Sequence, residues 1–278
     1  MTEYSGAVRE ALRSRGDPVS KLGYFCAPFR PAEGPLKDKV IKTYRGGRDP
    51  ELLEQLARRH TAYVEMLTWA GVRLPDTKFM ILNEAGYLQP VIVQDAIDEA
   101  LLMRPQVEAA DLPAALDMLE GAAISIAEFW ARVAQRGERI GYHPSIRNFA
   151  YDADGPIFFD TFPPLIGYSR EEMGRLLLRF SESGLVRTMG AVLPERIRAI
   201  QDEWYSPAGT IVGLIGSAVR LRPADGPAIL DWARGFAARD LDGALRAEVR
   251  AELDRPPRLP AIWTGTRRLL GLEGKPNV

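Results

Sequence analysis

The sequence contains a single cysteine, Cys26, and only two histidines, His60 and His143, among its 278 residues. One cysteine excludes a disulfide framework and a cysteine-based zinc site within one chain. Two histidines likewise exclude a histidine-rich metal site built within one chain. A chain of this length can bury a substantial core without such staples, so we expect an ordinary globular fold.

The sequence also lacks a marked net charge and a long apolar run. Its 36 lysines and arginines nearly balance 37 aspartates and glutamates, for a formal charge of −1. DNA and anionic membranes attract clustered positive charge, so neither partner is expected. No apolar stretch approaches the roughly 20 residues that span a membrane. The start, Met-Thr-Glu-Tyr-Ser-Gly, is polar and unlike a secretory signal, which predicts a cytoplasmic protein.

Short β-like runs dominate the sequence up to about residue 95. Runs rich in β-branched and aromatic residues predict three strands, at residues 39–45, 78–82 and 88–94. Pro50, with Asp49 as N-cap, opens a helix of apolar periodicity that continues to about residue 71. Pro90 predicts that the third strand lies at a sheet edge, or that its backbone nitrogen faces away from a partner.

Helical patterns dominate after residue 95. A short acidic helix is predicted at residues 95–103, and Asp111-Leu-Pro opens a long one at residues 114–135. A β-hairpin follows, with strands around residues 148–151 and 157–160 and a tight turn, Asp-Ala-Asp-Gly, between them. Later periodic segments predict further helices at residues 169–185, 194–204 and 227–251, and three prolines interrupt the tail, at positions 256, 257 and 260.

The stretch GYHPSIRNFAYDADGPIFFD, residues 141–160, resembles the catalytic loop and metal-binding strand of aminoglycoside-phosphotransferase-like kinases. In that family a loop Asp is followed five residues later by an Asn, and an acidic hairpin turn then leads to a second Asp. Asn148 stands at the Asn position here, and Asp160 stands at the second Asp. The resemblance implies that both residues bind Mg²⁺, which prefers hard oxygen ligands.

By this resemblance the chain would be an atypical member of the protein-kinase-like superfamily. The resemblance implies an α+β fold with two lobes. Residues 1–95 correspond to a small β-rich N-lobe with a nucleotide-binding sheet and one helix. Residues 96–278 correspond to a larger helical C-lobe that carries the catalytic loop and the inserted β-hairpin. ATP would bind with Mg²⁺ in the groove between the lobes.

The run VIKTY resembles the family's strand whose lysine holds the α- and β-phosphates, which makes Lys42 the phosphate-binding candidate. Family kinases pair this lysine with a glutamate on the following helix. The matching position falls near His60 or Thr61, and neither is acidic. Glu65 is taken as the partner candidate, with two alternatives on the same predicted helix, Glu51 and Glu54.

The run PVIVQDAI resembles the strand and linker that cradle the adenine, with backbone groups of Gln94, Asp95 and Ala96 as the candidate contacts. No G-x-G-x-x-G loop precedes Lys42, and the nearest glycines are Gly23 and Gly34. The phosphate-covering loop of the family is therefore absent or reshaped in this chain.

The loop differs from the family at its catalytic position, because His143 stands where the family has its Asp and Gly141 where it usually has a His. His143 is a candidate base, since a neutral imidazole accepts a hydroxyl proton. The same replacement is also what a loss of hydroxyl phosphorylation would leave. Arg139 and Arg147 bracket the loop, either as surface charges or as contacts to a substrate phosphate or carboxylate.

The leading hypothesis is an ATP- and Mg²⁺-dependent phosphotransferase acting on a small molecule, such as a natural product. Four acidic residues follow the hairpin and could hold a cationic substrate: Glu171, Glu172, Asp202 and Glu203. The alternatives are a catalytically inactive kinase-like protein that binds a peptide or protein partner, and a kinase-fold enzyme that transfers AMP.

Overall fold

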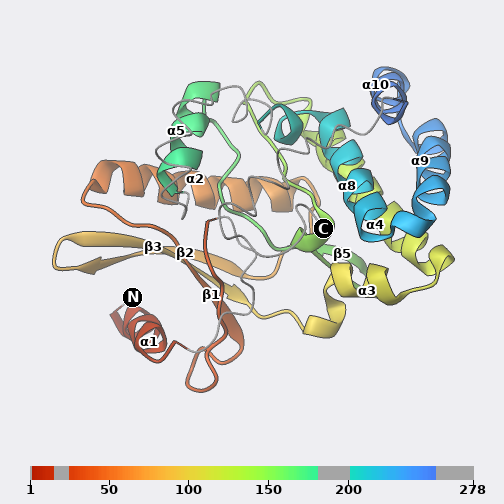
Figure 1. Ribbon diagram of the computed structural model, residues 1–278. Coiled ribbons are helices and arrows are strands. Elements are labelled where there is room, and N and C mark those ends of the chain that lie inside the picture. Colours follow the sequence, from red (N-terminus) through yellow and green to blue (C-terminus); the bar gives the residue numbers. More distant parts are fainter. Residues whose placement is uncertain (1, 16–24, 181–200, 255–278) are drawn as a thin grey trace.

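The computed structural model describes residues 2–15, 25–180 and 201–254, which form a mixed α+β structure with two small antiparallel sheets (Figure 1). The strands are β1 (Lys39–Thr43), β2 (Thr77–Glu84), β3 (Tyr87–Asp95), β4 (Phe149–Asp152) and β5 (Gly155–Phe158). The α-helices are α1 (Thr2–Arg13), α2 (Pro50–Trp69), α3 (Met103–Ala109), α4 (Leu112–Val133), α5 (Arg170–Phe180), α8 (Pro207–Leu221), α9 (Gly226–Asp240) and α10 (Gly243–Leu253). Short 3₁₀ turns are η1 (Glu99–Leu101), η2 (Ile146–Asn148) and η4 (Pro223–Asp225).

The larger sheet has the strand order β1-β3-β2 and is covered by a helix on each face, with α1 and α2 on opposite sides (Figure 1). Ile41 and Val91 point to the face packed by α1, where they join the apolar side of that helix through Val8. Ile92 points to the other face and joins the core beneath α2. Side chains alternate between faces along a strand, so Lys42, next to Ile41, points to the α2 side.

Pro90 does not mark a sheet edge, because β3 pairs with both neighbours and is the central strand. Its carbonyl accepts a hydrogen bond from the Tyr44 N–H at 3.0 Å. In an antiparallel strand the nitrogen and the carbonyl of one residue face the same neighbouring strand. The Pro90 nitrogen therefore also faces the side of β1, just beyond Thr43, where β1 ends. A missing donor is tolerated there because the ladder is already ending.

The helical part is built around α4, which packs against α8 and α9. The predicted start of α4 is confirmed, since the Asp111 side chain accepts from the Ala114 N–H at 2.9 Å. Inside the bundle, the Trp130 indole N–H donates to the Thr210 hydroxyl at 2.7 Å. This buried bond, together with the apolar stripe of α4, fixes α8 against α4.

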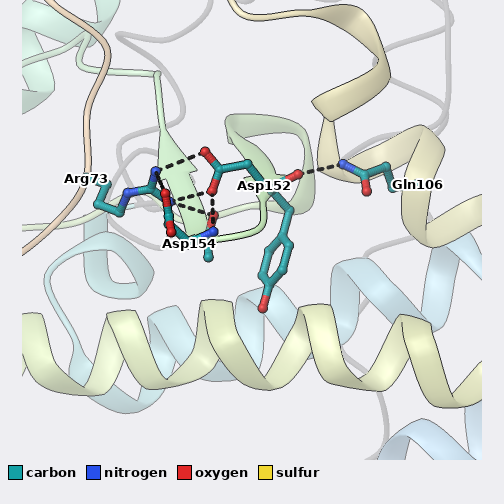
Figure 2. Close-up of polar contacts among 6 residues, drawn as sticks. Arg73, Gln106, Asp152 and Asp154 are labelled. Carbon is teal, nitrogen blue, oxygen red and sulfur yellow. Dashed lines mark hydrogen bonds and ion pairs between the residues drawn. The ribbon is translucent and has the colours of Figure 1, made fainter.

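A hairpin, β4–β5, forms around the predicted turn, with Asp152 opposite Gly155. Its second strand spans Gly155–Phe158 and not residues 157–160, so Asp160 lies beyond the strand that it was expected to end. Gly155 has a φ of 106°, which favours glycine. Arg73, in the segment between α2 and β2, donates two hydrogen bonds to the Asp152 carboxylate, at 2.8 and 2.9 Å. Figure 2 shows this pair, with Gln106 of α3 donating to the Tyr151 carbonyl on the other side. The hairpin is thus held on one side by Arg73, in the segment that leads into the larger sheet, and on the other by Gln106 of α3.

Several predicted boundaries need correction. The helix predicted at residues 95–103 does not form as one element, because β3 runs through Asp95 and α3 begins at Met103. The helix predicted at residues 227–251 is two helices, α9 and α10, separated at Leu241 and Asp242. Residues 181–185 and 194–200 of two predicted helices, Gly23 and the tail prolines lie outside the described residues. None of the helices in the described part of the chain has the length and apolar character needed to span a bilayer.

Candidate functional site

Lys42 connects the sheet with the segment that follows the hairpin. Its ammonium group donates to the Phe159 carbonyl at 2.6 Å and lies 5.6 Å from the centre of the Phe159 ring. The two residues are 117 positions apart in the sequence. The Lys42 side chain is only 7% exposed, so its charge needs a partner close by.

Asp160, directly after Phe159, supplies a negative charge near Lys42. Burial lowers the pKa of Lys42, and the charge of Asp160, followed by that of Cys26, acts in the opposite direction. Asp160 lies two residues beyond the end of β5, in the loop, and is partly exposed. A buried ammonium and a partly solvated carboxylate therefore face the same region.

His60 of α2 is buried, lies within reach of the Lys42 charge, and contacts the Thr161 hydroxyl through Nε2 at 2.9 Å. Burial, with a smaller contribution from the Lys42 charge, lowers the pKa of His60 to about 3. The imidazole is therefore neutral at physiological pH. Thr161 directly follows Asp160, so His60 supports the backbone that carries this carboxylate.

Glu65, the candidate partner of Lys42, is exposed to solvent, as are the two alternatives, Glu51 and Glu54. Glu65 lies five positions after His60, which places the two side chains about 140° apart around the helix. Because His60 occupies the inner face, Glu65 points away from the buried Lys42. The structure thus places a neutral imidazole where a carboxylate was expected.

Asn148 is buried and tied into the loop before the hairpin. Its side-chain amide donates to the His143 carbonyl at 3.0 Å, and its own carbonyl accepts from the Phe159 N–H at 3.0 Å. The first bond orients the side chain, so the carboxamide oxygen is the atom suited to a cation. The second bond places Asn148 beside the segment that carries Asp160.

His143 belongs to the same cluster. Burial lowers its pKa to about 4, the charge of Asp160 raises it, and the charge of Arg147 lowers it. Its ring packs against Trp204, with ring centres 4.3 Å apart. The structure thus brings together three sequence candidates: His143, Asn148 and Asp160. Lys42 joins them through Phe159.

Gly141, where the related kinases usually have a histidine, is required by close packing. A Cβ at this position would lie 2.9 Å from the Trp204 carbonyl oxygen. The Gly141 N–H donates to the Leu165 carbonyl at 2.7 Å, and its carbonyl accepts from the Tyr63 hydroxyl at 3.1 Å. These contacts fix the start of the loop, and they leave no room for a larger side chain.

The strand expected to hold adenine has backbone donors that already have partners. The Asp95 N–H donates to the Asp76 carbonyl at 2.9 Å, and the Ala96 N–H donates to the Asp38 carbonyl at 3.0 Å. The side chain of Gln94 is buried and donates to Thr77 at 2.8 Å. An adenine ring near residues 94–96 would therefore need other hydrogen-bonding groups of the protein, because these three donors already have partners within it.

The charged residues near the loop are mostly engaged locally. The guanidinium of Arg139 donates to the Tyr168 carbonyl and stacks on the Tyr205 ring at 3.4 Å. Glu172 accepts from the Ser169 N–H at the start of α5, which lowers the pKa of its carboxyl group.

Asp202 forms an ion pair with Arg170, while Glu171 and Glu203 are exposed. These contacts do not show the four acidic candidates converging on one substrate. Within the described ranges, no group of three or more His, Cys, Asp or Glu side chains is placed to bind a metal ion.

Two comparisons bear on relatives of the chain. A family model described as a family of unknown function, DUF6206, matches residues 3–274, which is nearly the full length. No curated protein matches the sequence.

Proposed function

We propose that this chain, which belongs to the family of unknown function DUF6206, is an ATP- and Mg²⁺-dependent phosphotransferase for a small-molecule substrate. The proposal includes a two-lobed kinase-like arrangement, with the sheet part and the helical part on either side of the nucleotide. One observation carries it. Lys42 from the sheet lies against Phe159, beside the two oxygen-bearing candidates Asn148 and Asp160.

The donor set fits Mg²⁺. Asp160 offers a carboxylate, and Asn148 offers a carboxamide oxygen whose amide nitrogen is already bonded to the His143 carbonyl. Mg²⁺ is commonly bound by one or two protein oxygens together with water and substrate phosphates, so two protein ligands are sufficient. When bound, the ion would neutralise part of the negative charge of the phosphates.

Lys42 would hold the nucleotide phosphates. An ammonium group has three donors, and the Phe159 carbonyl accepts one of them, so a phosphate oxygen can be added without breaking that bond. His143 would accept the proton of the attacking hydroxyl, because its imidazole is neutral at physiological pH. A pKa of about 4 makes it a weak base, so charge neutralisation and positioning would supply most of the rate.

A second candidate is a kinase-like protein without catalysis that binds a peptide or a partner protein. The weak base at His143 favours it, as do the engaged backbone donors of Asp95 and Ala96. The two candidates differ in one measurable respect, because only an enzyme transfers the γ-phosphoryl group.

The first test is thermal unfolding with and without ATP and Mg²⁺. A ligand at 100 times its Kd stabilises the folded state by about 2.7 kcal/mol. We expect this stabilisation in the wild type and in Asp154→Asn, and its loss in Asp160→Asn. Asp154 is a matched control, because it is an exposed carboxylate in the turn of the same hairpin. A shift of equal size in both variants would place the nucleotide elsewhere.

The second test measures transfer from γ-labelled ATP to a panel of hydroxylated and aminated small molecules. Transfer that disappears in Asp160→Asn supports the phosphotransferase. Mg²⁺-dependent binding without transfer to any compound supports the binding protein. The mass of the product identifies the alternative chemistry, because an added adenylyl group is much heavier than an added phosphoryl group.

A further inference from the structure

Two arginines from distant parts of the sequence converge on residues 166–168. Arg59 of α2 donates to the Ile166 carbonyl at 3.1 Å, and Arg139, in the loop between α4 and β4, donates to the Tyr168 carbonyl at 3.1 Å. The Arg59 guanidinium lies over the Tyr168 ring, 4.9 Å from its centre, and the Arg139 guanidinium lies 3.4 Å from the centre of the Tyr205 ring. Both arginines are partly buried. They form an arginine pair, Arg59 and Arg139, on either side of Tyr168.

The stacking leaves N–H donors of the arginine pair for a ligand. An aromatic ring contacts the face of a guanidinium, whereas the N–H donors point outward in its plane. Within the described residues, Arg59 gives a hydrogen bond to the Ile166 carbonyl alone, and the second contact of Arg139, with Gln201 Oε1, is long at 3.5 Å. Neither guanidinium forms an ion pair within the described ranges. A carboxylate or phosphate could therefore accept two N–H donors at once.

Gly167 permits the close approach of Arg59. It has a φ of 67°, which favours glycine, and a Cβ there would collide with Arg59 Nη1. The Glu138 carboxylate also lies nearby, 2.9 Å from the position of that Cβ, but it is exposed and forms no ion pair with a described residue. Water screens an exposed charge of this kind, so Glu138 does not neutralise the arginine pair.

Two other carboxylates near the arginine pair have partners of their own. Glu172 accepts from the Ser169 N–H at 2.8 Å, and Asp202 forms an ion pair with Arg170. The acidic residues that suggested a cationic substrate are therefore not gathered here, whereas two positive groups are.

Trp204 and Tyr205 connect the arginine pair to the candidate base. The Trp204 ring packs on His143, with ring centres 4.3 Å apart. Tyr205, the next residue, packs on Gly141, where a Cβ would lie 3.0 Å from Tyr205 Cδ1, and its ring also carries the Arg139 guanidinium. Since consecutive residues are about 3.8 Å apart along the chain, one small molecule can reach both His143 and Arg139.

We propose that Arg59 and Arg139 form a subsite for an oxyanion, a carboxylate or a phosphate, on the substrate that accepts the phosphoryl group. This inference rests on the proposed function and adds the substrate class, a hydroxylated small acid. The oxyanion would be held between α2 and the loop before β4, with the acceptor hydroxyl directed to His143.

The experiment is equilibrium dialysis with radiolabelled inorganic phosphate and, separately, with radiolabelled malonate. We expect the wild type to bind at least one probe, and the better bound probe identifies the preferred oxyanion. The double variant Arg59→Gln/Arg139→Gln should bind that probe about 10-fold more weakly or worse, since a hydrogen bond to a charged group contributes a factor of this order. A smaller loss, or a wild type that binds neither probe, would overturn the proposal.

Matched controls come from two neighbouring arginines. Arg58 precedes Arg59 on α2 and lies 3.9 Å from Glu54, and Arg136 stacks on Trp69 with 4.6 Å to the ring centre. The double variant Arg58→Gln/Arg136→Gln removes the same charge outside the arginine pair and should bind both probes as the wild type does. An equal loss in this control would show a general charge effect and overturn the proposal.

The arginine pair also holds the backbone of residues 166–168, so stability is measured alongside binding. Circular dichroism and urea unfolding check each variant. If Arg59→Gln/Arg139→Gln is not folded, Arg59→Lys/Arg139→Lys carries the test. Lysine keeps the charge and a donor for each carbonyl but lacks the planar fork, so the probe should again bind about 10-fold more weakly.

A third variant separates the subsite from the proposed nucleotide site. Lys42→Met should keep the binding of both probes within about 2-fold, because Lys42 donates to Phe159 and not to residues 166–168. Loss of binding in Lys42→Met, with binding kept in the double arginine variant, would assign the oxyanion to the nucleotide site and overturn the proposal.

The substrate class is tested in the transfer assay with labelled ATP. Compounds with a carboxylate or phosphate should have a higher kcat/KM than their uncharged or aminated counterparts, and Arg59→Gln/Arg139→Gln should remove this preference. A preference for aminated compounds would overturn the proposal.

The outcomes distinguish this inference from the proposed function. If ATP and Mg²⁺ stabilise the wild type but oxyanion binding does not depend on the arginine pair, the inference is wrong and the proposed function stands. If oxyanion binding depends on the arginine pair while ATP and Mg²⁺ do not stabilise the protein, the oxyanion site stands and the phosphotransferase proposal fails.

Discussion

Acidification should destabilise the protein through its two histidines, both of which the fold holds in the neutral form. The pKa of His60 is lowered to about 3 and that of His143 to about 4, whereas an unfolded histidine has a pKa of about 6.5. Between pH 8 and pH 5 the unfolded chain therefore takes up two protons that the folded chain does not. The stability that comes from keeping each imidazole neutral is fully present above pH 6.5. It is lost progressively as the pH falls toward the folded pKa values.

The magnitude follows from the pKa values. At pH 5 the medium is 1.5 units below the unfolded pKa and still above both folded values, so each histidine costs about 2 kcal/mol relative to pH 8. Both together should lower the free energy of unfolding by about 4 kcal/mol, while most carboxyl groups remain ionised. Urea unfolding at a series of pH values measures this directly. His60→Gln and His143→Gln should each remove about half of the pH dependence.

The reasoning would be refuted by a free energy of unfolding that stays constant from pH 8 to pH 5. Nuclear magnetic resonance gives an independent check, since only two imidazoles contribute signals. In the folded protein, neither resonance should titrate above pH 5. A midpoint near 6.5 for either one would show that this imidazole is solvated, contrary to its position in the cluster.

Two further predictions concern the supports of the site. Asp152→Asn should cost about 1 kcal/mol of stability, because it removes a partly exposed two-point contact with Arg73, whereas Asp154→Asn should have little effect, since that carboxylate lies 3.9 Å from Arg73 and is mostly exposed. Chemical denaturation compares the two, and equal losses would show that the contact contributes nothing. Gly141→Ala should destabilise by about 1–3 kcal/mol, because its Cβ would lie 2.9 Å from a carbonyl oxygen, whereas Gly137→Ala meets nothing within 4 Å and should not destabilise. Indistinguishable thermal midpoints for these two variants would contradict the packing described for the loop.

Local patterns were sufficient to predict much of the secondary structure. The hairpin followed from β-like runs around Asp-Ala-Asp-Gly, and the start of α4 followed from Asp111 and the proline after Leu112. Helix α1 was not predicted, although Val8 and Ala11 repeat at helical spacing and are buried. Its segment is short and rich in polar residues, and it becomes stable by covering a face of the sheet.

Contacts between distant segments could not be predicted in the same way. Pro90 indicated either an edge strand or a backbone nitrogen without a partner strand. The sheet has β3 at its centre, and the Pro90 nitrogen lies just beyond the end of β1, where the loss of one donor is tolerated. The candidates Lys42, Asn148 and Asp160 were found by resemblance, and their gathering around Phe159 needed the structure. His60 was noted in the sequence only as a position that matches the family's glutamate. Its contact with Thr161 was not predicted, because that contact depends on which face of α2 is turned inward.

The most direct measurement of the central claim is a crystal structure of the protein with Mn²⁺ in place of Mg²⁺ and a non-hydrolysable ATP analogue, with the metal located by anomalous scattering. The account predicts the metal within about 2.0–2.3 Å of oxygens of Asn148 and Asp160. It also predicts a phosphate oxygen within hydrogen-bonding distance of the Lys42 ammonium. A metal or nucleotide bound away from Lys42, Asn148 and Asp160 would contradict the claim. So would a complex in which these three side chains lie far apart from one another.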